Sequence, residues 1–178
     1  MTIDPEFQRE RRTQIEKIGS DKSLRDLSCR WSNRAQASRY SYHFDWLGLP
    51  IIQYPPDVLA LQEIVWRVKP NLIVETGVAR GGSAIFYASM LELLAACGHG
   101  DGMVVSIDID LRPRNRQAIL QHPLSRRVEL IEGSSIADKT VEEVRSKTCR
   151  DSRVLVCLDS HHTHEHVLSE LRAYAPLV

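Results

Sequence analysis

The chain has 178 residues, of which 43% are hydrophobic and 26% are charged. This composition is typical of one globular domain, since a domain has about 150 residues. Lysine plus arginine and aspartate plus glutamate number 23 each, and the balance argues against a general binder of nucleic acids or anionic membranes. The four cysteines form no CxxC pair, and the chain shows neither a membrane span nor a secretory signal. We therefore expect no zinc ribbon, no membrane partner and a cytoplasmic location.

Residues 1–54 differ in character from the rest of the chain. Residues 6–18 are highly charged and predict a helix, whereas residues 28–50 hold aromatic side chains in a polar background. These aromatic residues are Trp31, Tyr40, Tyr42, Phe44 and Trp46. We interpret residues 1–54 as an N-terminal helical arm, which either only covers the core or forms a lid over a substrate site.

Residues 55–178 alternate between helical and strand patterns. Pro55-Pro56-Asp57 predicts a helix start with Asp57 as the capping residue, and Lys69-Pro70 predicts its end. We then expect strands at 72–74, 103–107, 128–131 and 154–158, and helices at 82–97, 113–121, 136–147 and 163–174. Strands rich in valine and isoleucine that alternate with helices predict an α/β fold with a parallel sheet wrapped on both faces. Ligands bind such sheets at the carboxyl ends of the strands.

Three strand ends carry small or acidic residues. After the first strand, the glycines of ETGVARGGS (75–83) can bring the backbone close to a ligand, although a turn shaped only for packing is the alternative. In SIDID (106–110) we favour Asp108 as the ligand of a ribose diol, with Asp110 as a secondary contact or helix cap. After the third strand, EGSS (132–135) suits the edge of a purine ring, and a plain turn is the alternative.

The fourth strand is followed by a histidine cluster. Four of the seven histidines fall within DSHHTHEH (159–166), and Asp159 directly follows an apolar strand. His162 and His166 could ligate zinc, or the segment could be a solvated helix start without chemistry. We favour a third interpretation, in which Asp159 holds a hard cation and a histidine accepts a proton.

Taken in order, ETGVARGGS, SIDID, EGSS and VLVCLDSHHTHEHV resemble the motifs of class I S-adenosylmethionine-dependent methyltransferases. Residues 40–178 are most similar to the cephalosporin hydroxylase family, which includes rhamnosyl O-methyltransferases. The resemblance implies a Rossmann-like doubly wound sheet that binds S-adenosylmethionine within residues 55–178. The cofactor-binding residues that we expect are Glu75, Gly77, Arg80, Gly81, Ser83, Asp108, Asp110, Gly133, Ser134 and Ser135.

The resemblance also implies a reaction, namely Mg²⁺-dependent O-methylation of a small hydroxylated molecule such as a natural product, a sugar or a β-lactam. Asp159 matches the metal ligand of the catechol-type enzymes, and His162 falls where those enzymes keep a lysine as general base. The catalytic residues that we expect are therefore Asp159 and His162, or His161 if the turn rotates. A histidine suits proton removal near neutral pH.

Two other functions stay open, and so does the extent of the chain. One is a non-catalytic cofactor-binding subunit that works with a partner enzyme. The other, an NAD(P)-dependent oxidoreductase, is disfavoured because the loop lacks the GxGxxG fingerprint. Relatives are commonly oligomeric, and we expect a homo-oligomer. A class I methyltransferase sheet has seven strands and only four are expected here, so we expect a C-terminally incomplete form of a longer enzyme.

Overall fold

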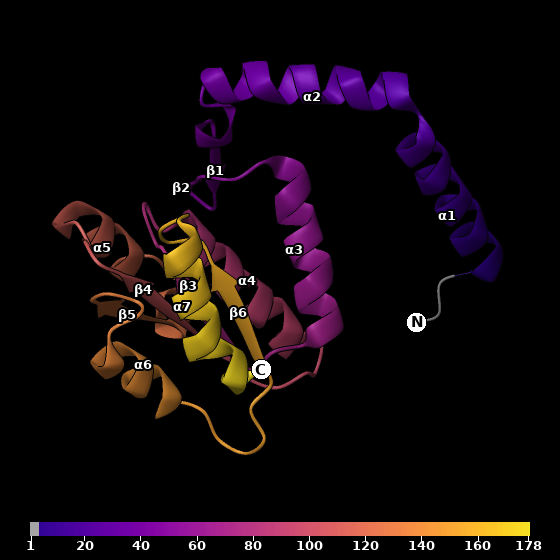
Figure 1. The fold of residues 1–178 in the computed structure, drawn as a ribbon. Helices are drawn as coiled ribbons and strands as arrows, with labels where there is room; N and C mark the ends of the chain where they lie inside the picture. The colour runs from indigo at the N-terminus through magenta and orange to yellow at the C-terminus, as the bar shows by residue number, and fades with distance from the viewer. Residues whose placement is uncertain (1–3) are drawn as a thin grey trace. The chain divides into compact units, whose positions relative to one another are not determined.

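The computed structural model describes residues 4–178, whose helices and strands are labelled in Figure 1. The chain divides into two compact units, with the boundary between Tyr40 and Ser41. The first unit contains α1 (Pro5–Ser20) and α2 (Lys22–Ala37). Each helix begins at an aspartate, because Asp4 accepts the N–H of Glu6 and Asp21 accepts the N–H of Leu24.

Neither helix of the first unit has a buried residue. Their exposed apolar side chains are Phe7, Ile15, Ile18, Leu24, Leu27 and Trp31. The helix expected at 6–18 is confirmed by α1, and α2 is an element that the sequence did not predict.

The second unit is built on a four-stranded parallel sheet of order β5-β4-β3-β6. Its strands are β3 (Leu72–Thr76), β4 (Met103–Asp108), β5 (Val128–Glu132) and β6 (Val154–Leu158). β4 and β5 follow β3 on one side, while β6 returns to pair with the other side of β3, from Leu72↔Val154 to Thr76↔Leu158. This is the predicted doubly wound arrangement, and the switch point where ligands bind lies between β3 and β6.

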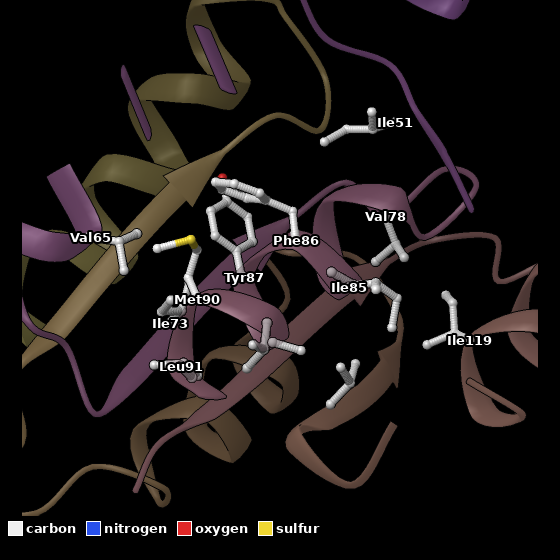
Figure 2. Packing of buried hydrophobic residues seen from close by; sticks show 14 of the residues in the cluster. Ile51, Val65, Ile73, Val78, Ile85, Phe86, Tyr87, Met90, Leu91 and Ile119 are labelled. Atoms are coloured by element: carbon white, nitrogen blue, oxygen red, sulfur yellow. The ribbon is translucent and has the colours of Figure 1, made fainter. Parts of the chain in front are cut away.

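Helices cover both faces of the sheet. They are α3 (Pro55–Val68), α4 (Gly82–Ala96), α5 (Pro113–Leu120), α6 (Asp138–Arg145) and α7 (His164–Tyr174). Figure 2 shows Phe86, Tyr87 and Met90 of α4 on the face that also receives Val65 and Ile119. On the opposite face, Val141, Val144 and Tyr174 of α6 and α7 pack against Leu72 and Val74. Because β3 contacts helices on both sides, all five of its residues are buried.

The start of α3 differs from the prediction, and its end agrees with it. α3 begins after Tyr54, with Pro55 at its first position, so Asp57 lies inside the first turn and is not the capping residue that we predicted. The predicted end is confirmed, because Lys69 takes a left-handed conformation with a φ of 52° just before Pro70.

A β-hairpin precedes α3. Its strands are β1 (Phe44–Trp46) and β2 (Leu49–Ile51), and the two residues between them, Leu47 and Gly48, both have positive φ, as a type I′ turn requires. The Trp46 ring stacks edge-on against Phe86 at 5.0 Å, and its Nε1–H donates to the Ser89 hydroxyl at 3.0 Å. These contacts join the hairpin to α4, so the hairpin belongs to the second unit. The boundary between the units therefore follows residue 40, whereas the sequence suggested a boundary after residue 54.

Residues 4–178 contain no helix with the length and apolar character needed to cross a bilayer.

Candidate functional site

A cavity of about 790 Å³ lies at the carboxyl ends of the parallel strands. Each of the four strand ends contributes to its lining, as does the segment around the hairpin. The volume is within the range of about 300–1,000 Å³ found for small-molecule and cofactor sites.

Backbone hydrogen bonds continue past the strand ends and hold the lining loops together. The N–H of Gly77 donates to the carbonyl of Ile107 at 2.8 Å, and the N–H of Asp159 donates to Thr76 at 2.9 Å. On the far side of β4, the N–H of Gly133 donates to the carbonyl of Asp108 at 2.9 Å. The floor of the cavity is therefore an extension of the sheet.

The glycines after β3 are required by neighbouring parts of the protein. Gly77 has a φ of 88°, and a Cβ on it would lie 2.6 Å from the carbonyl carbon of Asp159. A Cβ on Gly81, whose φ is also 88°, would lie 2.6 Å from Cδ1 of Ile119. A Cβ on Gly82 would lie 2.6 Å from the backbone N of Ile51. The packing interpretation of this loop thus accounts for all three glycines, and Gly77 lines the cavity as well.

Asp108, at the end of β4, already holds the loop in place. Its Oδ2 accepts the N–H groups of Val78 at 2.8 Å and Ala79 at 3.0 Å, and its Oδ1 accepts the N–H of Asp110 at 3.1 Å. Ala79 has a φ of 48°, unusual for a residue with a Cβ. Its carbonyl accepts the Asn115 amide at 2.8 Å, so Ala79 is held from both sides.

Glu75 is buried beneath the loop and does not line the cavity. Burial raises the pKa of its carboxyl to about 7, against the opposing hydrogen bonds from Ser83 and Ser106. The Ser106 hydroxyl donates to Oε2 at 2.7 Å. Glu75 is therefore placed to support the loop from below, with a proton that it can lose near neutral pH.

Asp159 and His162 face the cavity as a pair. Nε2 of His162 lies 3.2 Å from Oδ1 of Asp159, and both side chains are more than half exposed. Partial burial raises the pKa of the Asp159 carboxyl above its usual value, and the neighbouring His162 imidazole opposes this shift. A carboxylate that orients an imidazole is a common arrangement for proton transfer.

His166 contacts serine hydroxyls, whereas His162 contacts the Asp159 carboxylate. Its Nε2 lies 3.1 Å from the hydroxyl oxygens of both Ser135 and Ser160, and α7 begins only at His164. His162 and His166 therefore do not share a helix face as a zinc pair would require. Among residues 4–178, no group of three or more His, Cys, Asp or Glu side chains is placed to hold a metal ion.

Ten of the thirteen predicted site residues line the cavity. These are Gly77, Arg80, Ser83, Asp108, Gly133, Ser134, Ser135, Asp159, His161 and His162. Glu75 and Gly81 lie outside the lining for the packing reasons given above. The Asp110 carboxylate lies outside the lining and forms an ion pair with Arg112 at 3.3 Å. Arg112 is also the N-cap residue of α5, so Asp110 is not the helix cap.

Part of the segment around the hairpin lines the cavity, where the sequence had left open either a lid or an arm that only covers the core. Of the aromatic residues considered for a lid, Tyr42 lines the cavity, together with Ser41, Pro50, Ile52 and Gln53. Phe44 and Trp46 instead pack against the core. The helix residue Glu170 was missed, although a glutamate four residues after His166 on an otherwise apolar helix face is a usable signal.

Comparison with known proteins identifies the family of the chain. Residues 38–178 match the family described as rhamnosyl O-methyltransferase/CmcI. A rhamnosyl O-methyltransferase of Mycobacterium leprae is 30% identical over 137 residues, covering 75% of this chain and 55% of the relative. A rhamnosyl O-methyltransferase of Mycobacterium tuberculosis is 26% identical over 139 residues, covering 75% of this chain and 51% of the relative. The chain thus spans about half the length of the curated relatives it matches.

Solved structures share the fold. CmcI in an apo structure aligns with a TM-score of 0.56 at 23% identity, over 73% of this chain and 51% of CmcI. CmcI with Mg-SAM aligns with a TM-score of 0.52 at 20% identity, over the same shares of the two chains. At these identities the likeness concerns the fold alone.

Proposed function

Because the chain belongs to the rhamnosyl O-methyltransferase/CmcI family, we propose that it binds S-adenosylmethionine in the cavity at the strand ends and transfers the methyl group to a hydroxyl oxygen. The observation that carries the proposal is the convergence of Asp108, Ser135 and Asp159 on one cavity from three different strand ends. The names of the relatives favour a sugar hydroxyl, such as one on a rhamnosyl group, as the acceptor.

The lining residues fit the parts of the cofactor. Asp108 provides carboxylate oxygens for the ribose hydroxyls. Ser83 stands in the first turn of α4, where free N–H groups suit a carboxylate. Ser134 and Ser135 after β5 provide a narrow polar edge for the adenine. When bound, S-adenosylmethionine supplies an electrophilic methyl group on a sulfonium centre.

We assign removal of the acceptor proton to the Asp159–His162 pair, in which the two side chains lie 3.2 Å apart. With Nε2 of His162 donating to Asp159, Nδ1 keeps its lone pair and takes the hydroxyl proton. The acceptor oxygen forms a bond to the methyl carbon as the carbon–sulfur bond breaks, and the electron pair of that bond stays on sulfur. Since the reacting atoms must lie in line, positioning by the cavity supplies much of the rate.

We infer a limited role for magnesium. Asp108 and Asp159 are the carboxylates that line the cavity, and we assign the ion to Asp159; within residues 4–178 no group of three His, Cys, Asp or Glu side chains surrounds it. Mg²⁺ is often bound through one or two carboxylates with several waters. The ion would polarise the acceptor hydroxyl there, and we expect its binding to this chain to be weak.

The proposal is tested by two measurements on the 178-residue chain. The first is calorimetric titration with S-adenosylhomocysteine and, as the matched control, with NAD⁺; we expect saturable binding of the former only. The second is a mass-spectrometric screen for a gain of one methylene unit by sugar and natural-product hydroxyls, with and without Mg²⁺. Binding without transfer to any acceptor would support a cofactor-binding subunit, and failure to bind S-adenosylhomocysteine would refute the proposal.

A further inference from the structure

Two serines from different strand ends share one carboxylate oxygen. Ser135 follows β5 and Ser160 follows β6, and both hydroxyls donate to Oε1 of Glu170 at 2.6 Å. Distances this short are typical of hydroxyl groups that donate to a carboxylate. One side chain of α7 therefore connects the two loops across the floor of the cavity.

The carboxyl group of Glu170 is deeply buried. The residue is 1% exposed, and Oε2 has no hydrogen-bond partner. A buried acceptor without a partner costs about 1–3 kcal/mol, so a glutamate here is a poor choice for packing alone. Stability would be served better by an apolar residue of similar volume.

His166 completes the cluster one helical turn earlier. Its Nε2 lies 3.1 Å from each serine oxygen and 3.4 Å from Oε1 of Glu170. Because both serine protons point to Glu170, the serine oxygens can only accept, and Nε2 of His166 must carry the proton that they receive. The carboxylate thus sets the direction of every hydrogen bond in the cluster.

Ser135 lies on the side of the cavity that we propose for the cofactor, and Ser160 lies on the side of the Asp159–His162 pair. Ser135 lines the side proposed for the adenine, and the Tyr174 hydroxyl holds its carbonyl at 2.6 Å. Ser160 directly follows Asp159 and lies two residues before His162. A displacement of either serine would therefore move a loop of the site.

We propose that Glu170 is a positioning residue, which acts through Ser135, Ser160 and His166 to fix the spacing between the cofactor side of the cavity and the Asp159–His162 pair. This inference rests on the proposed function for its consequence, but the hydrogen-bond cluster itself exists without a ligand. The two parts can therefore be tested separately.

The first experiment reads the cluster without any ligand, by ¹⁵N NMR of the histidine rings in the whole chain. The wild-type His166 ring, assigned with a His166→Gln variant, is expected as the Nε2–H form. In Glu170→Met the serine hydroxyls lose their acceptor and can donate to Nε2, so the ring should change to the Nδ1–H form. In Glu170→Gln, which keeps an acceptor oxygen, the Nε2–H form should persist. A His166 ring that is the same in wild type and Glu170→Met would contradict the cluster.

The second experiment measures the affinity for S-adenosylhomocysteine. We expect Glu170→Met to raise Kd at least tenfold in protein that circular dichroism shows to be folded, and Glu170→Gln to recover most of the loss. Glu165→Met is the matched control, since it changes an exposed glutamate of the same helix, and its Kd should stay within twofold of wild type. A folded Glu170→Met with wild-type Kd would overturn the positioning role.

Two further variants cover the case in which Glu170→Met does not fold. Ser135→Ala and Ser160→Ala each remove one hydroxyl with little change in volume, and we expect each to raise Kd three- to tenfold. Wild-type affinity in both would overturn the proposal. If the wild-type chain itself fails to bind, the proposed function fails, whereas the NMR result still decides the cluster.

Discussion

Gly77 and Asp159 meet at the switch point of the sheet, where the α-carbon of Gly77 faces the backbone carbonyl of Asp159 with no space for a side chain. Gly77 begins the loop after β3, and Asp159 carries the carboxylate that we place beside the acceptor. The two halves of the proposed site are therefore in direct backbone contact, and the first residue of the loop after β3 determines how closely the end of β6 can approach.

We predict that Gly77→Ala lowers the free energy of unfolding by about 3 kcal/mol or more, since the new methyl group must displace backbone atoms. Binding of S-adenosylhomocysteine should be lost as the loop moves. Gly48→Ala is the matched control, because Gly48 has a similar φ of 90° but open space around it, and it should cost only about 1 kcal/mol. Equal effects of the two substitutions in urea denaturation would contradict the steric explanation.

The buried Glu75 should make stability depend on pH. Its pKa is raised from 4.5 to about 7 in the folded protein, so the folded state binds more protons than the unfolded state between these values. The free energy of unfolding should therefore fall as pH rises from about 5 to 7.5, by up to about 3 kcal/mol, and then level off. Urea denaturation at several pH values measures the slope.

Glu75→Gln should remove this part of the pH dependence, because the amide does not ionise. Glu165→Gln makes the same chemical change at an exposed position and should leave the slope as in wild type. If Glu75→Gln keeps the full wild-type slope, another group is responsible.

Asp108 and Asp110 should differ sharply, although they are two residues apart. Asp108→Asn removes the charge that holds the N–H groups of Val78 and Ala79, and we expect Kd for S-adenosylhomocysteine to rise at least thirtyfold. Asp110→Asn loses only an exposed ion pair with Arg112, worth under about 1 kcal/mol, and should change Kd less than threefold. Comparable losses in a calorimetric titration would count against Asp108 as the ribose ligand.

Asp159→Ala should abolish methyl transfer while leaving Kd for S-adenosylhomocysteine within about threefold of wild type. The expected reason is that Asp159 orients His162, and His162→Gln should cause a comparable loss of transfer. His164→Gln serves as control, because His164 is exposed and starts α7 outside the cavity. Methyl transfer at the wild-type rate in Asp159→Ala, measured by mass shift, would remove Asp159 from the mechanism.

Local sequence patterns predicted the parallel strands and most helices of the second unit, because each of these elements is marked by residues that are neighbours in the chain. The runs Leu72–Val74 and Val154–Leu158 consist of apolar residues, as is typical of strands buried in a parallel sheet. The hairpin was missed because its strands have three residues each and include Pro50, so no alternating pattern can develop. α2 was missed because its few apolar residues are scattered among charged ones.

The parts of the site that sequence could not predict depend on contacts between distant residues. Gly81 needs to be glycine because of Ile119, which lies 38 positions later and packs against it. Glu170 meets Ser135 across 35 positions, and Asn115 reaches Ala79 across 36. A motif identifies which residue types are present, but the neighbours of each residue are decided by how the helices cross the sheet.

The hydrogen bonds of Asp108 have a further consequence for ligand entry. A carboxylate has about four acceptor positions, and three of them are occupied by the N–H groups of Val78, Ala79 and Asp110. A ribose diol brings two donors, so its arrival must be an exchange in which one backbone N–H gives up its acceptor. Ribose recognition by this residue should consequently add less affinity than its charge suggests, and it should favour ligands that offer the released N–H an acceptor of their own.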